Sequence, residues 1–157
     1  MSKVDLTDLA DSPLFKGLAA KEIEYLGTIF SLHNVAEGKT LFIENMPGES
    51  LYLIKHGTIT ISQMLSENNE QILAVLGGGD IFGELAIIDG GARATSARVA
   101  EAAVLYCLKR KDFLTLTSEK PRLGMQLTLN IARTLSGRMR SAKKDYRAML
   151  SVLTKQH

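Results

Sequence analysis

The sequence predicts a mainly β fold, an antiparallel sandwich or barrel, with an N-terminal helix and a long C-terminal helix. Between about residues 34 and 108, short apolar stretches alternate with turn residues, which is typical of antiparallel sandwiches and barrels. Helical spacing precedes this stretch, and no glycine-rich turn cluster follows Lys111. We therefore expect an N-terminal helical segment over 1–33, a β core over 34–110 and C-terminal helices over 111–157.

Length and composition indicate one globular domain. The chain has 157 residues, of which 45% are hydrophobic and 23% charged, and this argues against a disordered chain. Its single cysteine, Cys107, cannot form an internal disulfide, which fits a reducing compartment. The N-terminus has no apolar run of signal-peptide length, and the longest apolar stretch, Ala102 to Leu108, is too short to cross a bilayer. These features predict a cytoplasmic protein without membrane attachment.

Local patterns place the individual elements. Residues 19 to 30 carry apolar side chains at helical spacing (Ile23, Leu26, Ile29 and Phe30), so they predict a short helix. Turn residues delimit the strands of the roll: Gly38, Pro47-Gly48, Gly57, Asn68-Asn69 and Gly77-Gly78-Gly79-Asp80. The strands expected between them are Thr40–Ile43, Leu51–Ile54, Thr58–Ile61, Ile72–Leu76 and Val104–Leu108.

The C-terminal part predicts two helices. Lys111 to Leu116 fits one short helix, and Pro121 is well placed as the first residue of a longer one. Apolar residues spaced 3-4-3-4-3-4 along the longer helix predict a coiled-coil seam and therefore a homodimer, unless the stripe folds back on the roll of its own chain. The seam consists of Ala132, Leu135, Met139, Ala142, Tyr146, Met149 and Leu153.

The segment that carries chemistry runs from Gly79 to Ser96. Gly83 allows a ligand close to the backbone, and one helical turn over Glu84 to Ile88 would favour an anion at its start. Arg93 follows a small-residue loop, and its guanidinium fits phosphate oxygens. Glu84 supplies an acceptor for a ribose hydroxyl, so the two side chains together suggest a nucleotide site.

Here the sequence resembles the cyclic nucleotide-binding domain family, which includes catabolite activator proteins, protein kinase A regulatory subunits and cyclic-nucleotide-gated channels. The resemblance is carried by Phe-Gly-Glu-Leu-Ala at 82–86 and Arg-Ala at 93–94, and it extends over about residues 12 to 140. Pro13-Leu14-Phe15 with Gly17-Leu18 and Gly57-Thr58-Ile59 also look like family features. The resemblance implies an antiparallel β-roll (double-stranded β-helix or jelly-roll) over 34–110 with flanking helices. It also implies Arg93 on the cyclic phosphate, Glu84 on the 2′-hydroxyl and backbone amides of residues 83–86 around the phosphate.

The resemblance also implies a ligand and a full set of binding residues. In this family, readers of cGMP usually carry Thr immediately after the arginine, where this chain has Ala94, so we expect cAMP to be preferred over cGMP. Thr95 departs from the alanine usual at its position, and Arg138 and Met139 align with residues that cap the base. The expected binding residues are Val75, Phe82, Gly83, Glu84, Leu85, Ala86, Arg93, Ala94, Thr95 and Arg138.

Two other classes of function stay open. Glu84 and Arg93 could form a structural ion pair on the surface of the roll. The chain could also be a scaffold that kept the fold and lost the ligand, although the presence of both Glu84 and Arg93 argues against this. A cupin-like enzyme would need a metal cluster, but the histidines (His33, His56 and His157) lie far apart, and no nucleophile–base pair stands out. We therefore expect no catalytic residue, no metal and no cofactor. Cys107 fits a buried thiol, and Gly77-Gly78-Gly79 a turn between strands.

The positive charge is concentrated in the C-terminal helix. From Pro121 onward there are eight Lys or Arg against one acid, Asp145, although the net charge of the chain is only +2. This face is either solvated or available to nucleic acid or another acidic partner. Only a few residues follow Leu150, so we expect no helix-turn-helix domain and no sequence-specific DNA binding. The sequence does not identify the protein effector.

Overall fold

The computed structural model describes residues 3–155; residues 1–2 and 156–157, including His157, lie outside them. Short helices form the N-terminal part: η1 Thr7–Leu9, η2 Pro13–Phe15 and α1 Ala20–Leu26. The roll follows: β1 Ser31–Val35, β2 Thr40–Phe42, β3 Ser50–Ser66, β4 Asn69–Leu76, β5 Ile81–Phe82, α2 Glu84–Asp89 and β6 Ser96–Lys109. Two helices complete the chain, α3 Arg110–Glu119 and α4 Pro121–Lys155.

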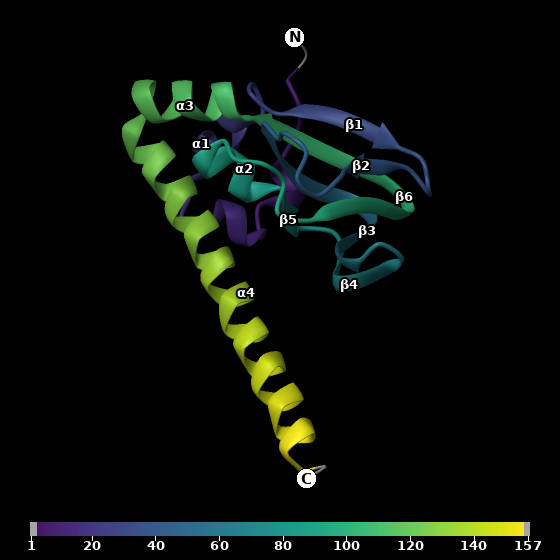
Figure 1. The fold of residues 1–157 in the computed structure, drawn as a ribbon. Coiled ribbons are helices and arrows are strands. Elements are labelled where there is room, and N and C mark those ends of the chain that lie inside the picture. The colour runs from purple at the N-terminus through teal and green to yellow at the C-terminus, as the bar shows by residue number, and fades with distance from the viewer. Residues whose placement is uncertain (1–2, 156–157) are drawn as a thin grey trace.

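The strands form one antiparallel sheet that curls into a roll. Its order is β1-β6-β3-β4, with β2 also paired to β6 and β5 to β3. The helices gather at one end of the roll, and α4 crosses this end and then runs past the β3–β4 hairpin (Figure 1). The expected mainly β roll with a long C-terminal helix is confirmed, and Pro121 is the first residue of that helix.

One expected turn is a bulge. The sequence pattern places Gly57 between two strands, but β3 runs unbroken from Ser50 to Ser66. Its pairing with β6 shifts register on both sides of Gly57, whose φ is 95°. A Cβ at Gly57 would lie 2.5 Å from the Ala102 carbonyl oxygen. Glycine therefore lets a long strand bend against β6 without reversing direction.

The N-terminal helix is shorter than its apolar spacing predicts. α1 ends at Leu26, so Ile29 and Phe30 lie outside it, and the first strand begins at Ser31, within the segment expected to be helical. The Gly27 carbonyl accepts a hydrogen bond from the Val4 amide at 2.9 Å, and a Cβ at Gly27 would lie 2.2 Å from the Val4 carbonyl oxygen. The N-terminal segment thus packs against Gly27, where α1 ends. Phe30, directly after the turn that follows α1, is buried.

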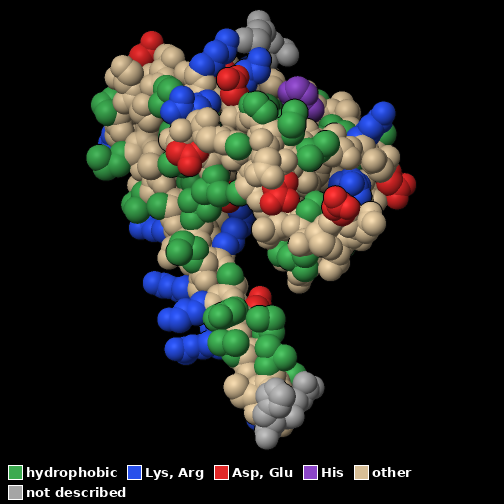
Figure 2. All heavy atoms as spheres, in the orientation of Figure 1, with side chains coloured by type: hydrophobic (Ala, Val, Ile, Leu, Met, Phe, Trp, Pro, Cys, Tyr) green, Lys and Arg blue, Asp and Glu red, His purple; other side chains and the backbone are tan. Residues whose placement is uncertain are grey.

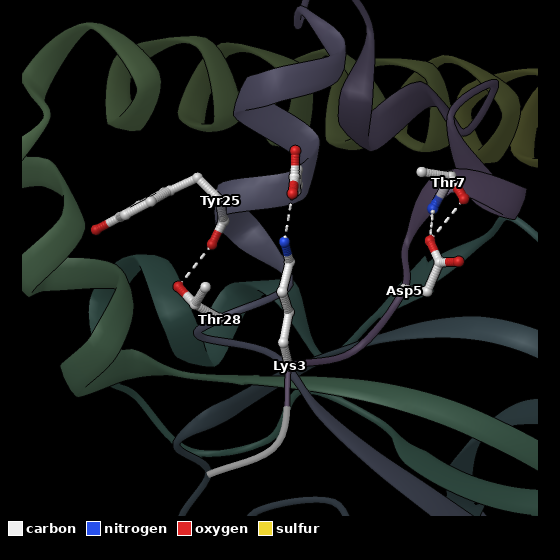
Figure 3. A network of polar contacts seen from close by, with 6 residues as sticks. Lys3, Asp5, Thr7, Tyr25 and Thr28 are labelled. Carbon is white, nitrogen blue, oxygen red and sulfur yellow. Dashed lines mark hydrogen bonds and ion pairs between the residues drawn. The ribbon is translucent and has the colours of Figure 1, made fainter.

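Polar contacts hold this crossing segment in place (Figure 3). Lys3 Nζ lies 2.6 Å from Glu24 Oε1 on α1, and Asp5 Oδ1 accepts hydrogen bonds from the amide and hydroxyl of Thr7. The Thr7 hydrogen bonds lower the pKa of Asp5 from its ordinary value. The Asp5 carbonyl also accepts the hydroxyl of Tyr106 on β6 at 2.9 Å. The segment that begins at Lys3 is therefore attached to both the helical layer and the sheet.

Two apolar clusters form the core. One fills the inside of the roll and includes Ile54, Ile59 and Leu105. The other joins the N-terminal helices, α3 and the first part of α4 to the end of the roll, with Leu127 and Ile131 fully buried. Cys107 is a free, buried thiol, as expected, and burial raises its pKa. Among residues 3–155, no helix is both long and apolar enough to span a membrane.

Candidate functional site

A cavity of 1190 Å³ lies between the roll and α4. Small-molecule sites usually measure about 300–1,000 Å³, so this space is sufficient for a nucleotide. β4, α2 and the loop before β6 form the roll wall, and a face of α4 forms the opposite wall. The roll wall is partly apolar, with Ile72, Leu73, Ala74 and Leu76 from β4. The two walls are distant in sequence, and the fold alone brings them together.

Arg93 is the buried cation of this cavity, only 6% exposed. Its Nη1 donates hydrogen bonds to the carbonyls of Ser50 at 2.9 Å and Gly83 at 3.1 Å. The guanidinium carbon lies 4.0 Å from the centroid of the Phe42 ring, within the range of a cation–π contact. Burial lowers the pKa of Arg93 from its ordinary value, yet an arginine side chain stays protonated in proteins. Its Nε is buried without a hydrogen-bond partner among the described residues.

Two glycines make room for this guanidinium. A Cβ at Gly48 would lie 2.3 Å from Arg93 Nε, and one at Gly83 would lie 2.7 Å from its Nη1. Gly83 also has a φ of 74°, a left-handed backbone conformation that residues other than glycine rarely adopt. Backbone hydrogen bonds between the 45–46 turn and Arg93 hold the arginine loop against this seat. The conformation of Arg93 is therefore fixed by backbone groups and not by an acidic side chain.

Glu84 is the buried anion of the cavity and the first residue of α2. Its Oε1 accepts a hydrogen bond from Arg138 Nη1 at 2.5 Å. Arg138 Nη2 donates to the Ile81 carbonyl at the start of β5. The alternative of a Glu84–Arg93 ion pair is therefore wrong, because Glu84 pairs with α4 while Arg93 is held by carbonyls.

Nine of the ten expected binding residues line this one cavity, and Val75 does not. Val75 is 63% exposed on β4, although its neighbours Ala74 and Leu76 line the cavity. Met139, aligned with a base-capping position, is also misplaced: it is 73% exposed and lies outside the cavity lining. One residue along the helix, Arg138 faces the cavity. The nine residues are Phe82, Gly83, Glu84, Leu85, Ala86, Arg93, Ala94, Thr95 and Arg138.

Sequence reasoning missed the groups that hold these side chains. The sequence pattern marks Phe42 only as part of an apolar strand and Gly48 only as a turn residue. Ser50 contributes a backbone carbonyl, which no sequence signal marks. Asn130 was also missed: its Nδ2 donates to the carbonyls of Leu14 and Lys16, fastening α4 to η2. An asparagine on the apolar side of a helical pattern is the only signal that could have drawn attention to it.

The expected seam along α4 is divided in the structure. Leu135 packs against the core of its own chain, and Ala142 lines the cavity. The folding-back alternative therefore holds for Leu135, which is partly buried, whereas Ala142 lines the cavity but is exposed. The other seam residues are exposed: Ala132, Met139, Tyr146, Met149 and Leu153.

Other chemical sites find little support among residues 3–155. No group of three or more His, Cys, Asp or Glu there could hold a metal ion. The ring Nε2 of His33 lies 3.0 Å from Ser31 Oγ on the same strand. Gly77 to Gly79 form the turn between β4 and β5, as expected, with the Asp80 amide bonded to the Gly77 carbonyl.

Comparison with known proteins places this fold and site in a family. The cyclic nucleotide-binding domain matches residues 32–120, so the chain belongs to that family. Over 124 residues it is 35% identical to the cyclic AMP receptor protein of Thermus thermophilus, covering 79% of this chain and 57% of that protein. It therefore spans little more than half of this curated relative.

Solved structures agree with this assignment. The crystal structure of the Thermus thermophilus catabolite activator protein is similar with a TM-score of 0.78 and 33% identity, over 88% of this chain and 63% of that one. A cAMP-bound PfPKA-R structure is similar with a TM-score of 0.63 and 33% identity, over 69% of this chain and 39% of that one. The expected similarity to catabolite activator and protein kinase A regulatory proteins is confirmed.

Proposed function

We propose that this chain binds a cyclic nucleotide, preferentially cAMP, and acts as a non-enzymatic regulatory module in the cytoplasm. The observation that carries the proposal is the seat of Arg93. A buried guanidinium is held by two carbonyls between two glycines, faces a nucleotide-sized cavity and has no partner for its Nε among the described residues. A buried donor without a partner is costly, so a bound acceptor would stabilise it.

The chemistry of the cavity matches the parts of a cyclic nucleotide. The guanidinium of Arg93 suits the single negative charge of a cyclic phosphodiester. Glu84 offers a carboxylate oxygen to a ribose hydroxyl, and the apolar β4 residues Ile72 and Leu73 offer a surface to the base. The relative from Thermus thermophilus is a cyclic AMP receptor, and the cAMP-bound PfPKA-R structure has the same fold, which also favours this ligand.

We propose cAMP over cGMP because of the residue after the arginine. Ala94 lines the cavity and provides no hydroxyl for the guanine amino group. A polar edge without a partner gains nothing on binding. We expect cAMP to bind about tenfold more tightly than cGMP, a difference of about 1.4 kcal/mol. Thr95, which also lines the cavity, is the nearest hydroxyl that could reduce this difference.

Calorimetric titration of the wild-type chain with cAMP, cGMP and 5′-AMP tests the proposal. We expect saturable binding of cAMP, weaker binding of cGMP, and much weaker binding of 5′-AMP, whose dianionic, open phosphate does not fit a single buried guanidinium. Binding of none of the three would favour the alternative of a scaffold that has lost its nucleotide. Equal or reversed affinity for cGMP would refute the base preference alone.

We also propose a homodimer through the apolar face of the distal part of α4. Residues 139–155 are exposed, and Figure 2 shows hydrophobic side chains on one side of this segment and Lys and Arg on the other. At 3.6 residues per turn, Met139, Tyr146 and Leu153 share one side, whereas Arg140 and Lys144 lie on another. An apolar stripe of this kind must be buried to stabilise the helix.

Sedimentation at tens of micromolar protein tests the dimer. Met139→Asp should give a monomer, because it places a charge within the proposed seam, whereas Lys144→Asp on the basic side should remain a dimer. A monomeric wild type, or two variants that sediment alike, would contradict the proposed interface. The protein effector and the absence of sequence-specific DNA binding remain predictions of the sequence.

A further inference from the structure

The contact between Arg138 and Glu84 joins α4 to the sugar-reading side of the proposed site. We propose that Arg138 is a positioning residue: it orients the Glu84 carboxylate for the ribose 2′-hydroxyl, and so couples that hydroxyl to the docking of the distal part of α4. The proposal rests on the proposed function, since it assigns a role to Arg138 within the same cavity. The family resemblance implies a different role for Arg138, that of capping the base.

The geometry of the pair leaves room for the ligand. Arg138 bonds only one carboxylate oxygen, Oε1, and no described residue donates a hydrogen bond to Oε2. A carboxylate accepts several hydrogen bonds, so one oxygen can hold the guanidinium while the other accepts the hydroxyl. Both the guanidinium and a ribose hydroxyl would make charge-assisted hydrogen bonds to this carboxylate, and its two oxygens allow both bonds at once. The ribose should therefore share Glu84 with Arg138 and not displace it.

One further contact gives Arg138 control over the direction of the Glu84 carboxylate. Its second terminal nitrogen donates to the Ile81 carbonyl, so the plane of the guanidinium is fixed at two points. The Glu84 side chain is 8% exposed, whereas that of Arg138 is 37% exposed. A buried carboxylate that loses its partner would turn toward water, and this would remove the oriented acceptor.

The same residue is the last attachment of α4 to the roll. Asn130 attaches α4 to the Leu14 carbonyl at one side of the cavity, and Arg138 attaches it to Glu84 two turns later. Every residue from Met139 to Lys155 is exposed. Gly137, directly before Arg138, lines the cavity and would have no atom within 4 Å of an added Cβ. Because a glycine inside a helix weakens it, we expect α4 to bend most readily next to Arg138.

Coupling of this kind works in both directions. If Arg138 strengthens binding of the ribose hydroxyl, the ribose must strengthen docking of Arg138 by the same factor. A nucleotide with the 2′-hydroxyl should then protect the backbone around residues 137–145, and a nucleotide without it should not. This would convert recognition of the sugar into a change at the helix that we propose as the dimer interface.

The test measures affinities for cAMP and 2′-deoxy-cAMP on the full chain. Wild type, Arg138→Ala and Arg138→Lys are compared with Arg140→Ala, which removes an exposed cation from another side of the same helix. We expect wild type and Arg140→Ala to prefer cAMP by about tenfold or more. In Arg138→Ala the preference should fall below about threefold, and Arg138→Lys should lie between, because a lysine cannot fork to both acceptors. Amide exchange over residues 134–150 with each nucleotide gives the second readout.

Every other outcome overturns the inference in a recognisable way. An equal loss of affinity for both nucleotides in Arg138→Ala would assign Arg138 to the base or to general charge. A larger preference for cAMP in that variant would show that Arg138 competes with the ribose. Wild type that binds both nucleotides equally would show that Glu84 does not read the sugar, although the proposed function would stand. Wild type that binds neither nucleotide would reject the proposed function itself.

Discussion

The two walls of the cavity are built in opposite ways. On the roll wall, Arg93 is buried and held by backbone carbonyls between two glycines. On the α4 wall, Arg138 is partly exposed, belongs to a helix that is free beyond it, and is held by two groups of the roll. The comparison suggests that the two walls have different roles. The rigid wall with Arg93 would bind the anion, and the movable wall with Arg138 would change when the site is filled.

The largest expected effect tests the rigid wall. Arg93→Ala should weaken cAMP binding by at least about thirtyfold, because loss of one partner of a desolvated charge pair costs about 2–5 kcal/mol. The fold should persist, since the cavity rather than the core loses the side chain. Calorimetry measures the loss, and Arg98→Ala on the exposed surface of β6 is the matched control. If Arg93→Ala and wild type bind equally, Arg93 does not bind the phosphate.

A smaller effect tests how closely that wall is fitted. Gly48→Ala would place a methyl group 2.3 Å from Arg93 Nε and should displace the guanidinium. We expect about a tenfold loss of cAMP affinity, about 1.4 kcal/mol, with little change in thermal stability. Gly77→Ala is the control, because a Cβ there would meet no atom within 4 Å. Equal affinities of the two alanine variants would mean that the seat of Arg93 is not critical.

The smallest effect belongs to the movable wall. Gly137→Ala adds a side chain in open space within α4, and should stabilise the helix by about 0.5–1 kcal/mol. Amide exchange around residues 134–141 should slow in the absence of nucleotide, and cAMP affinity should change by less than about threefold. A loss of affinity beyond about tenfold would instead show that the bound nucleotide needs the glycine backbone at close range.

Sequence patterns specified the site better than its surroundings. Phe82 to Ala86 and Arg93 lie close together in the chain, so their spacing alone places them in one loop region, and the structure gathers them in one cavity. The predictions that Val75 and Met139 face the ligand failed, because a shift of one position moves a side chain to another face of a strand or helix. The same sensitivity explains why Arg138 faces the cavity while its neighbour is exposed.

Local patterns by themselves determined the antiparallel strands, the flanking helices and the placing of one arginine and one glutamate in the same short segment. These features depend on apolar periodicity and on residue types within a short stretch of chain. Tertiary structure alone decided that Glu84 pairs with Arg138, that Gly48 and Phe42 seat Arg93, and that Leu135 packs on its own roll. Such contacts join residues far apart in the chain, and their geometry is fixed only when the sheet closes and α4 packs across its end.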